Sequence, residues 1–323
     1  MVIFNSTLNQ LLMMLSLVLV GFFLRKAKLL PDNSHVILSK LETLVFLPAL
    51  NFATQIKQCN PTTFRENSAL ILYGLLLILI PVSLALTVPY LLIKRKNKDL
   101  ASEYQRNVYK YAITIANYGF VGNFIILGIW GEELFFKYSL FTFSFGIISY
   151  AWGLYLLIPR KESEGVLIGI KKALLSPPLV AMIVGIICGL LGLGKYMPDF
   201  LGTALDNASS CMGPIAMLIT GLVIGGYEIK SLLFDKKSYI MAFMRLIAIP
   251  SLILSIIVLL GGNEELLILA LVGFAAPIGL NTIVFPAAYG GNTKPGASMV
   301  MISQLLSVIT IPLLYLIFSN LIA

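Results

Sequence analysis

The sequence predicts an all-α membrane protein with ten transmembrane helices, arranged as two inverted repeats of five, in which helices 4 and 9 are broken and cross. Two observations support this fold class. Of the 323 residues, 58% are hydrophobic and only 12% are charged, whereas soluble domains carry about 25% charged residues. Two apolar segments half a chain apart also contain residues that interrupt a helix, and such a pair is typical of inverted-repeat transporters.

The two interruptions have similar chemistry. The first is Ala116–Asn123, Ala-Asn-Tyr-Gly-Phe-Val-Gly-Asn, in which each glycine costs about 1 kcal/mol relative to alanine and each asparagine needs hydrogen-bond partners in hydrocarbon. The second is Ala276–Thr282, Ala-Pro-Ile-Gly-Leu-Asn-Thr, in which Pro277 removes a helical hydrogen bond. When the two halves are overlaid, Gly119 and Gly279 take equivalent positions. We therefore expect a break near the centre of both helices.

The remaining helices are predicted from uncharged runs long enough to cross a bilayer, which takes about 20 residues. The clear runs are Met1–Leu24, Leu70–Ile93, Tyr111–Gly131, Tyr138–Pro159, Ala173–Gly194, Asn207–Tyr227, Leu266–Thr293 and Pro295–Ala323. Two weaker runs contain charged residues, namely Ser34–Thr54 with Lys40 and Glu42, and Ser238–Asn263 with Arg245. Counting both gives five helices in each half, residues 1–159 and 173–323, joined by a short cytoplasmic linker at 160–172.

The basic residues predict the orientation. With ten helices and the N-terminus outside, the outer loops contain only Lys57, Arg65, Lys137 and Lys195, and the other loop cations lie inside. Both termini are then outside the cell membrane. Because each half has an odd number of helices, the second half enters the membrane from the opposite face, as an inverted repeat requires.

Several function classes are disfavoured by the composition. The net charge of +8 is divided among short clusters between apolar runs, a pattern that indicates membrane topology and gives no reason to expect a nucleic-acid partner. The three cysteines form no CxxC pair and there is a single histidine, so neither a metal site nor a cofactor is expected. No nucleophile, base and acid occur together in a pattern that would predict a membrane-embedded enzyme.

The two breaks predict an anion site. Each half-helix that resumes after a break begins with unpaired N–H groups and carries about half a positive charge at that end. In an inverted repeat both of these ends lie near the bilayer midplane, where a carboxylate could bind. The uncharged side chains Asn117, Asn123, Asn281 and Thr282 would add hydrogen bonds. The alternative interpretation is that the glycines only let helices approach each other, and we adopt it for Gly185 with Gly189 and for Gly221 with Gly225.

Four polar residues within or directly beside the predicted spans need separate interpretation. Glu42 is a candidate proton or cation site, unless it pairs with Lys40 or extends to the inner surface. Asn51 either faces the site or bonds to a neighbouring helix. Arg245 is expected to extend to the inner surface, and Asp206 is expected to cap the seventh helix.

Four motifs carry a resemblance to a known family. They are Asn117-Tyr-Gly-Phe-Val-Gly122, Leu47-Pro-Ala-Leu50, Pro214-Ile-Ala-Met-Leu-Ile-Thr-Gly221, and Ala276-Pro277 with Tyr289-Gly-Gly291. Together they resemble the auxin efflux carrier family, which includes bacterial malate and malonate permeases and the plant auxin exporters. The long hydrophilic insert of the plant exporters is absent, so the chain is similar to the compact prokaryotic members.

The resemblance implies a fold like that of bile acid/sodium symporters. Helices 1, 2, 6 and 7 would form a scaffold, often dimeric, and helices 3–5 and 8–10 a mobile transport domain. The substrate would bind where helices 4 and 9 cross and would move by elevator-type alternating access. By position, the implied substrate-binding residues, together with those predicted from the breaks, are Asn51, Asn117, Gly119, Phe120, Gly122, Asn123, Pro277, Gly279, Asn281 and Thr282.

This chain departs from the family pattern at two places. Asn123-Phe124-Ile125 follows the first break where family members often have a nearby proline, and the third helix contains no acidic residue. Glu42 is then the only residue that the sequence offers as a candidate for coupling to H⁺ or Na⁺. The first hypothesis is a secondary transporter of a small organic anion such as malate or another carboxylate. Its alternatives are a sodium-coupled symporter, a passive anion channel and, in another class, a membrane-embedded enzyme.

Overall fold

The computed structural model describes residues 2–93, 100–157, 166–288 and 291–322, and the regular elements within these ranges are all helical. Seven of the described helices are long and apolar enough to cross a membrane. The predicted class, an all-helical membrane protein, is confirmed. The count of ten crossing helices stays a prediction, because interrupted or short segments such as Phe143–Leu157 and Pro177–Leu190 do not reach that length.

The first half of the chain contains one uninterrupted long helix and several that change geometry along their length. The elements are α1 (Val2–Lys26), α2 (Ser34–Leu41), the π-helical turn η1 (Glu42–Phe46), α3 (Leu47–Gln58), α4 (Pro61–Asn67), α5 (Ala69–Ala85), α6 (Val88–Leu92), α7 (Leu100–Thr114), the π-helical turn η2 (Tyr118–Gly122), α8 (Asn123–Phe141) and α9 (Phe143–Leu157). Within α8, Gly131 has φ 76° and ψ −168°, a conformation almost restricted to glycine, and it divides the helix where the fourth span was predicted to end.

The second half has the same alternation of long and interrupted helices. The elements are α10 (Val166–Leu174), α11 (Pro177–Leu190), the 3₁₀ turn η3 (Leu193–Tyr196), α12 (Asp199–Gly225), α13 (Ile229–Leu233), α14 (Lys236–Phe243), the π-helical turn η4 (Met244–Ala248), α15 (Ile249–Leu259), α16 (Glu264–Ala275), α17 (Asn281–Ala288) and α18 (Lys294–Ile322). The second part of the predicted linker therefore belongs to α10. Residues 160–165 of that linker, and Tyr289 and Gly290 of the family motif, lie outside the described residues.

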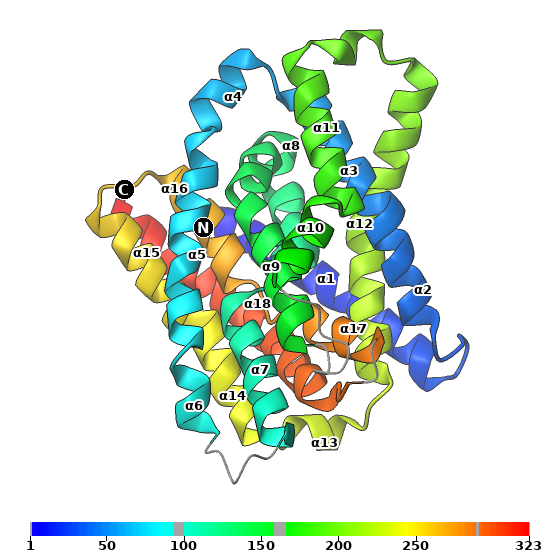
Figure 1. Cartoon of the computed structure of the whole chain (residues 1–323), viewed down its shortest axis with the longest axis vertical. Coiled ribbons are helices and arrows are strands. Elements are labelled where there is room, and N and C mark those ends of the chain that lie inside the picture. Colours follow the sequence, from blue (N-terminus) through cyan, green and yellow to red (C-terminus); the bar gives the residue numbers. More distant parts are fainter. Residues whose placement is uncertain (1, 94–99, 158–165, 289–290, 323) are drawn as a thin grey trace.

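Two pairs of helices pack closely along their length. α1 packs against α12 and α3 packs against α11, and α12 also contacts α3 (Figure 1). A Cβ atom at Gly221 of α12 would overlap the Val18 carbonyl oxygen of α1, and one at Gly189 of α11 would lie 2.5 Å from the carbonyl oxygen of Cys59. These glycines thus permit close helix contact, as their spacing predicted.

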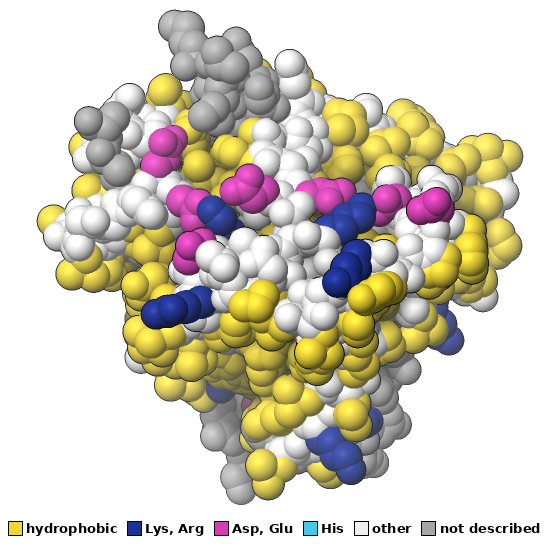
Figure 2. All heavy atoms as spheres, turned by 90° about the horizontal axis from the view of Figure 1, so that it is seen from above, with side chains coloured by type: hydrophobic (Ala, Val, Ile, Leu, Met, Phe, Trp, Pro, Cys, Tyr) yellow, Lys and Arg dark blue, Asp and Glu magenta, His cyan; other side chains and the backbone are white. Residues whose placement is uncertain are grey.

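The sides of the molecule are apolar. On α5, for example, Leu72, Leu76 and Leu79 recur on one helix face and are all about half exposed. Exposed leucine stripes of this kind suit a hydrocarbon environment and would be unfavourable in water. Figure 2 looks onto one end of the molecule, where acidic and basic side chains cross the face between apolar ones.

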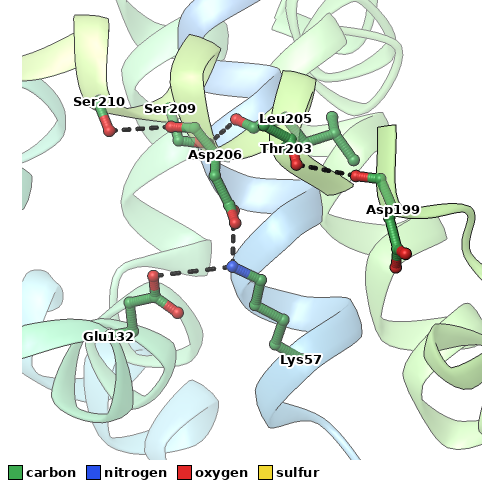
Figure 3. A network of polar contacts seen from close by, with 8 residues as sticks. All are labelled: Lys57, Glu132, Asp199, Thr203, Leu205, Asp206, Ser209 and Ser210. Carbon is green, nitrogen blue, oxygen red and sulfur yellow. Dashed lines mark hydrogen bonds and ion pairs between the residues drawn. The ribbon is translucent and has the colours of Figure 1, made fainter. Parts of the chain in front are cut away.

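A small polar network between α3, α8 and α12 corrects one expectation. The Lys57 ammonium, just before α3 ends, lies 2.6 Å from an Asp206 carboxylate oxygen and 3.9 Å from one of Glu132 (Figure 3). Asp206 was expected to cap the seventh helix, which is wrong because α12 begins two turns earlier, at Asp199. The uncharged run in the sequence begins only after Asp206, but the helix extends from there toward the N-terminus as far as Asp199. Charged residues are tolerated in these first turns where the turns lie outside hydrocarbon.

Candidate functional site

The first predicted break is present between α7 and α8. α7 ends at Thr114, and the chain becomes helical again in the wide π turn η2 from Tyr118. The Asn117 carbonyl accepts the first intrahelical bonds, from the N–H groups of Val121 and Gly122, each at 3.0 Å. The N–H groups that precede these two have no acceptor within their own helix. The resumed helix therefore offers donors at its start.

The second predicted break is present between α16 and α17. α16 ends at Ala275 and α17 begins at Asn281. The Leu280 carbonyl accepts the N–H groups of Ile283 at 2.8 Å and of Val284 at 3.0 Å. Between the helices, the Ile278 N–H donates to the Ser303 hydroxyl of α18 at 3.0 Å, which fixes the extended segment. The Thr282 N–H also donates to the Gly279 carbonyl, at 3.1 Å, so the first N–H groups of α17 are largely satisfied within the break itself.

The two breaks contact each other directly. Ala116 and Ile278 form an isolated antiparallel bridge, and the Asn117 N–H donates to the Pro277 carbonyl at 2.7 Å. In an antiparallel pair the facing residues can exchange two such bonds, but proline has no N–H and cannot return the second. One backbone hydrogen bond therefore joins Asn117 to Pro277.

A cavity of about 130 Å³ lies beside this crossing. Seven of the ten predicted site residues line it, namely Asn51, Asn117, Gly119, Phe120, Asn123, Gly279 and Asn281. Its walls come from both sides of the fold, because η1, α3 and α11 supply residues as well as the two breaks, α8 and α9. Among the described residues that line the cavity, none carries a formal charge.

Three asparagine amides in the cavity wall have different hydrogen bonds. The Nδ2 of Asn281 donates to the hydroxyls of Tyr111 at 3.0 Å and Ser149 at 3.3 Å, and that of Asn51 donates to the Pro178 carbonyl at 2.9 Å. Asn117 is only 3% exposed, and its Nδ2 has no hydrogen-bond partner in the part of the chain that the structure describes. Asn117 is therefore the amide with a buried donor still to be satisfied, while Asn51 both lines the cavity and bonds to a neighbouring helix.

Three predicted site residues do not line the cavity. Pro277 makes the bond at the crossing described above. The Thr282 hydroxyl donates to the Gly279 carbonyl at 2.8 Å, within its own turn. Gly122 faces away, toward Tyr138, whose hydroxyl oxygen would overlap a Cβ at that position. These residues shape the breaks without forming the cavity surface.

Hydroxyl groups were missed by the sequence analysis. Thr43, Ser139, Thr142, Ser149 and Ser176 also line the cavity. They are scattered singly through apolar runs, and no spacing in the sequence distinguishes them from the serines and threonines elsewhere in the chain. Only the tertiary arrangement shows that they share one surface.

Arg245 was expected to extend to the inner surface, which is wrong. The residue lies in η4 and is 1% exposed. Its Nη1 donates to the carbonyls of Ile113 at 2.8 Å and Thr114 at 3.3 Å, and its Nη2 donates to the Gly273 carbonyl at 3.4 Å. These carbonyls belong to the last turns of α7 and α16, the two helices that end at the breaks.

Glu42 lies one residue from the cavity wall. It is 0% exposed at the start of η1, next to the cavity residue Thr43. Neither carboxylate oxygen has a hydrogen-bond partner among the residues that the structure describes, and Lys40 is exposed. Neither of the two structural explanations considered, a pair with Lys40 or extension to the surface, therefore applies.

Comparison with known proteins decides the family. The family model described as membrane transport protein matches residues 6–315. The chain belongs to this family. It is the auxin efflux carrier family that the motifs around the two breaks indicated.

Two archaeal relatives support the assignment. A protein of Methanothermobacter thermautotrophicus described as an uncharacterized transporter is 28% identical over 228 residues, which cover 69% of each chain. A Methanocaldococcus jannaschii protein with the same description is 26% identical over 310 residues, which cover 95% of this chain and 97% of that protein. The chain is thus a multi-pass member of the membrane transport protein family.

Proposed function

We propose that this protein is a secondary transporter of a small organic anion, a malate-like dicarboxylate or another carboxylate, which binds where the two broken helices cross. The observation that carries this proposal is the uncharged cavity beside the bridge between Ala116 and Ile278, with the unpartnered Asn117 amide donor in its wall. Two resumed helices begin there and each adds about half a positive charge. A carboxylate would accept hydrogen bonds from these donors without a basic side chain in the cavity wall.

The cavity size favours short substrates. Benzene, with six non-hydrogen atoms, occupies a cavity of about 150 Å³ in another protein. The volume of about 130 Å³ observed here therefore suits short mono- and dicarboxylates, and malate would fill it tightly. Auxin, with a bicyclic ring system in addition to its carboxylate, is disfavoured.

The cavity position supports alternating access of the elevator type. Helices α1, α3, α11 and α12 pack on one another, and we propose that they form the scaffold of a homodimer in the cell membrane. The transport domain would contain the two crossing helices and their neighbours, in a repeat of five plus five helices with both termini outside. Because both groups of helices line the cavity, sliding one past the other would expose the substrate alternately on the two sides of the membrane.

Glu42 is our candidate for coupling. A buried intramembrane carboxylate without a cationic partner is an unfavourable arrangement that commonly marks a proton or cation pathway. Its place next to Thr43 in the cavity wall would let its protonation respond to movement of the transport domain. We therefore propose that H⁺ accompanies the anion.

Uptake and counterflow in proteoliposomes test the transporter assignment. Labelled malonate, malate and short monocarboxylates are offered with and without imposed proton and sodium gradients. A carrier gives saturable uptake that is accelerated when the same anion is present on the opposite side, and a passive channel gives neither. Absence of flux for every carboxylate would refute the proposed substrate class, and chemical conversion of the anion would indicate an enzyme.

A further inference from the structure

The two helices that end at the crossing bring a set of negative backbone groups together. The last four carbonyls of a helix have no partner within it, and that end carries about half a negative charge. Ile113 and Thr114 close α7, and Gly273 lies in the last turn of α16. In other broken-helix transporters, half-helix C-terminal ends and unwound carbonyls coordinate the coupling cation. A carbonyl set of the kind that binds Na⁺ is therefore present where α7 and α16 end.

Here an arginine already occupies that carbonyl set. The buried guanidinium of Arg245 donates to all three carbonyls, at 2.8 to 3.4 Å. η4 is a π-helical turn, and such turns often mark functional sites. None of the ion pairs formed by the described residues involves Arg245. Among the described residues, the hydrogen bonds of the Arg245 side chain all go to the carbonyls of these two helix ends.

The charges at the crossing can be compared. Two helix N-termini contribute about +0.5 each and two C-termini about −0.5 each, so the four ends together nearly cancel. Arg245 adds one full positive charge that no carboxylate neutralises among the described residues. Arg245 therefore makes the contribution of the crossing helices to the local field positive.

We propose that Arg245 is a fixed cation that takes the place of a bound sodium ion at the crossing and makes the site selective for anions. This proposal rests on the transport function proposed above. Arg245 is not among the residues that line the cavity, so it acts as a specificity-determining and positioning residue, without contact to the substrate. Transport should therefore need no sodium.

The first test needs no substrate. Melting temperatures of the purified protein are compared in equal concentrations of sodium, potassium and choline chloride. We expect the same value in all three salts, because the carbonyl set is filled. Stabilisation of the unsubstituted protein by sodium, but not by potassium or choline, would overturn the proposal.

The second test separates charge from packing. Arg245→Met removes the charge and the donors, Arg245→Lys keeps the charge, and Arg65→Met removes an exposed arginine of α4 as a matched control. We expect malonate uptake to fall at least about tenfold in Arg245→Met, because the attraction of a nearby unit positive charge for the anion is lost. It should fall less in Arg245→Lys and not at all in Arg65→Met, with no sodium dependence in the unsubstituted protein or in either of these two variants.

The outcomes distinguish the two proposals. Uptake by Arg245→Met at the original rate, or an equal loss in Arg245→Lys and Arg245→Met, would overturn the role of the fixed charge while leaving the carrier assignment intact. If Arg245→Met does not fold, the comparison of Arg245→Lys with the unsubstituted protein decides, and loss of all uptake in a folded Arg245→Lys counts against the charge. If the unsubstituted protein carries no carboxylate, the proposed function fails, and the salt dependence of the melting temperature still tests occupation of the carbonyl set.

Discussion

Replacing Asn117 by alanine should weaken transport without weakening the fold. Its buried Nδ2 lacks a partner among the described residues, and an unsatisfied buried donor costs about 1–3 kcal/mol. Alanine removes that donor, and the gain offsets the looser packing that a smaller side chain leaves around it. The melting temperature of the substrate-free variant should therefore be at least equal to that of the unsubstituted protein.

The effect on substrate has the opposite sign. A hydrogen bond to a charged group contributes about 1.5–3 kcal/mol, which corresponds to roughly 10- to 150-fold in affinity. The half-saturation concentration for malonate uptake should rise by such a factor in Asn117→Ala. Asn51→Ala is the matched control, because its Nδ2 bonds to the Pro178 carbonyl at 2.9 Å and its removal should lower the melting temperature.

Two results would refute this reasoning. An unchanged half-saturation concentration in Asn117→Ala would show that the amide does not donate to the substrate. A melting temperature well below that of the unsubstituted protein, with uptake lost in proportion to folded protein, would show that the amide is structural. The assay is therefore paired, with thermal unfolding and uptake measured on the same preparation.

Four other substitutions give distinct outcomes. Glu42→Gln should leave counterflow intact but abolish the acceleration of uptake by a proton gradient, and persistence of that acceleration would exclude Glu42 as the coupling group. Gly122→Ala should destabilise the protein by about 1–3 kcal/mol in thermal unfolding, because the new Cβ would overlap the Tyr138 hydroxyl. Gly119→Ala meets no atom within 4 Å and should fold normally but reduce uptake by narrowing the cavity. Lys57→Met should lower the melting temperature by the equivalent of less than about 1 kcal/mol, and only at low salt, because its ion pairs are partly exposed; a large change at high salt would contradict this.

The two helix breaks were predictable because their causes are local. Glycine and asparagine at Ala116–Asn123 and proline with glycine at Ala276–Thr282 disfavour a continuous helix wherever the segment lies in the fold. The inverted-repeat pattern further predicted that the breaks meet, and Ala116 and Ile278 do form a bridge. Local chemistry combined with repeat symmetry thus located the candidate site.

The environment of Arg245 was not predictable in the same way. A single arginine near the end of an apolar run is typical of a side chain that extends to the membrane surface. Its actual partners, the carbonyls of Ile113, Thr114 and Gly273, lie far away in the sequence. The π turn that contains it also leaves no recognisable pattern, because it differs from an α-helix by one additional residue per turn.

The unpaired charge of Arg245 has an electrical consequence. In the proposed mechanism the crossing helices move through the bilayer with this charge among them, and the cavity wall carries no opposite charge. A bound monocarboxylate would cancel the charge, whereas the substrate-free domain would carry it across alone. Each 100 mV of membrane potential is worth about 2.3 kcal/mol per elementary charge that crosses it. The voltage across the membrane would therefore act mainly on the return of the unloaded carrier if a monocarboxylate crosses by itself. With one accompanying H⁺, the loaded and unloaded carriers would carry the same charge, and the voltage would set no direction of accumulation.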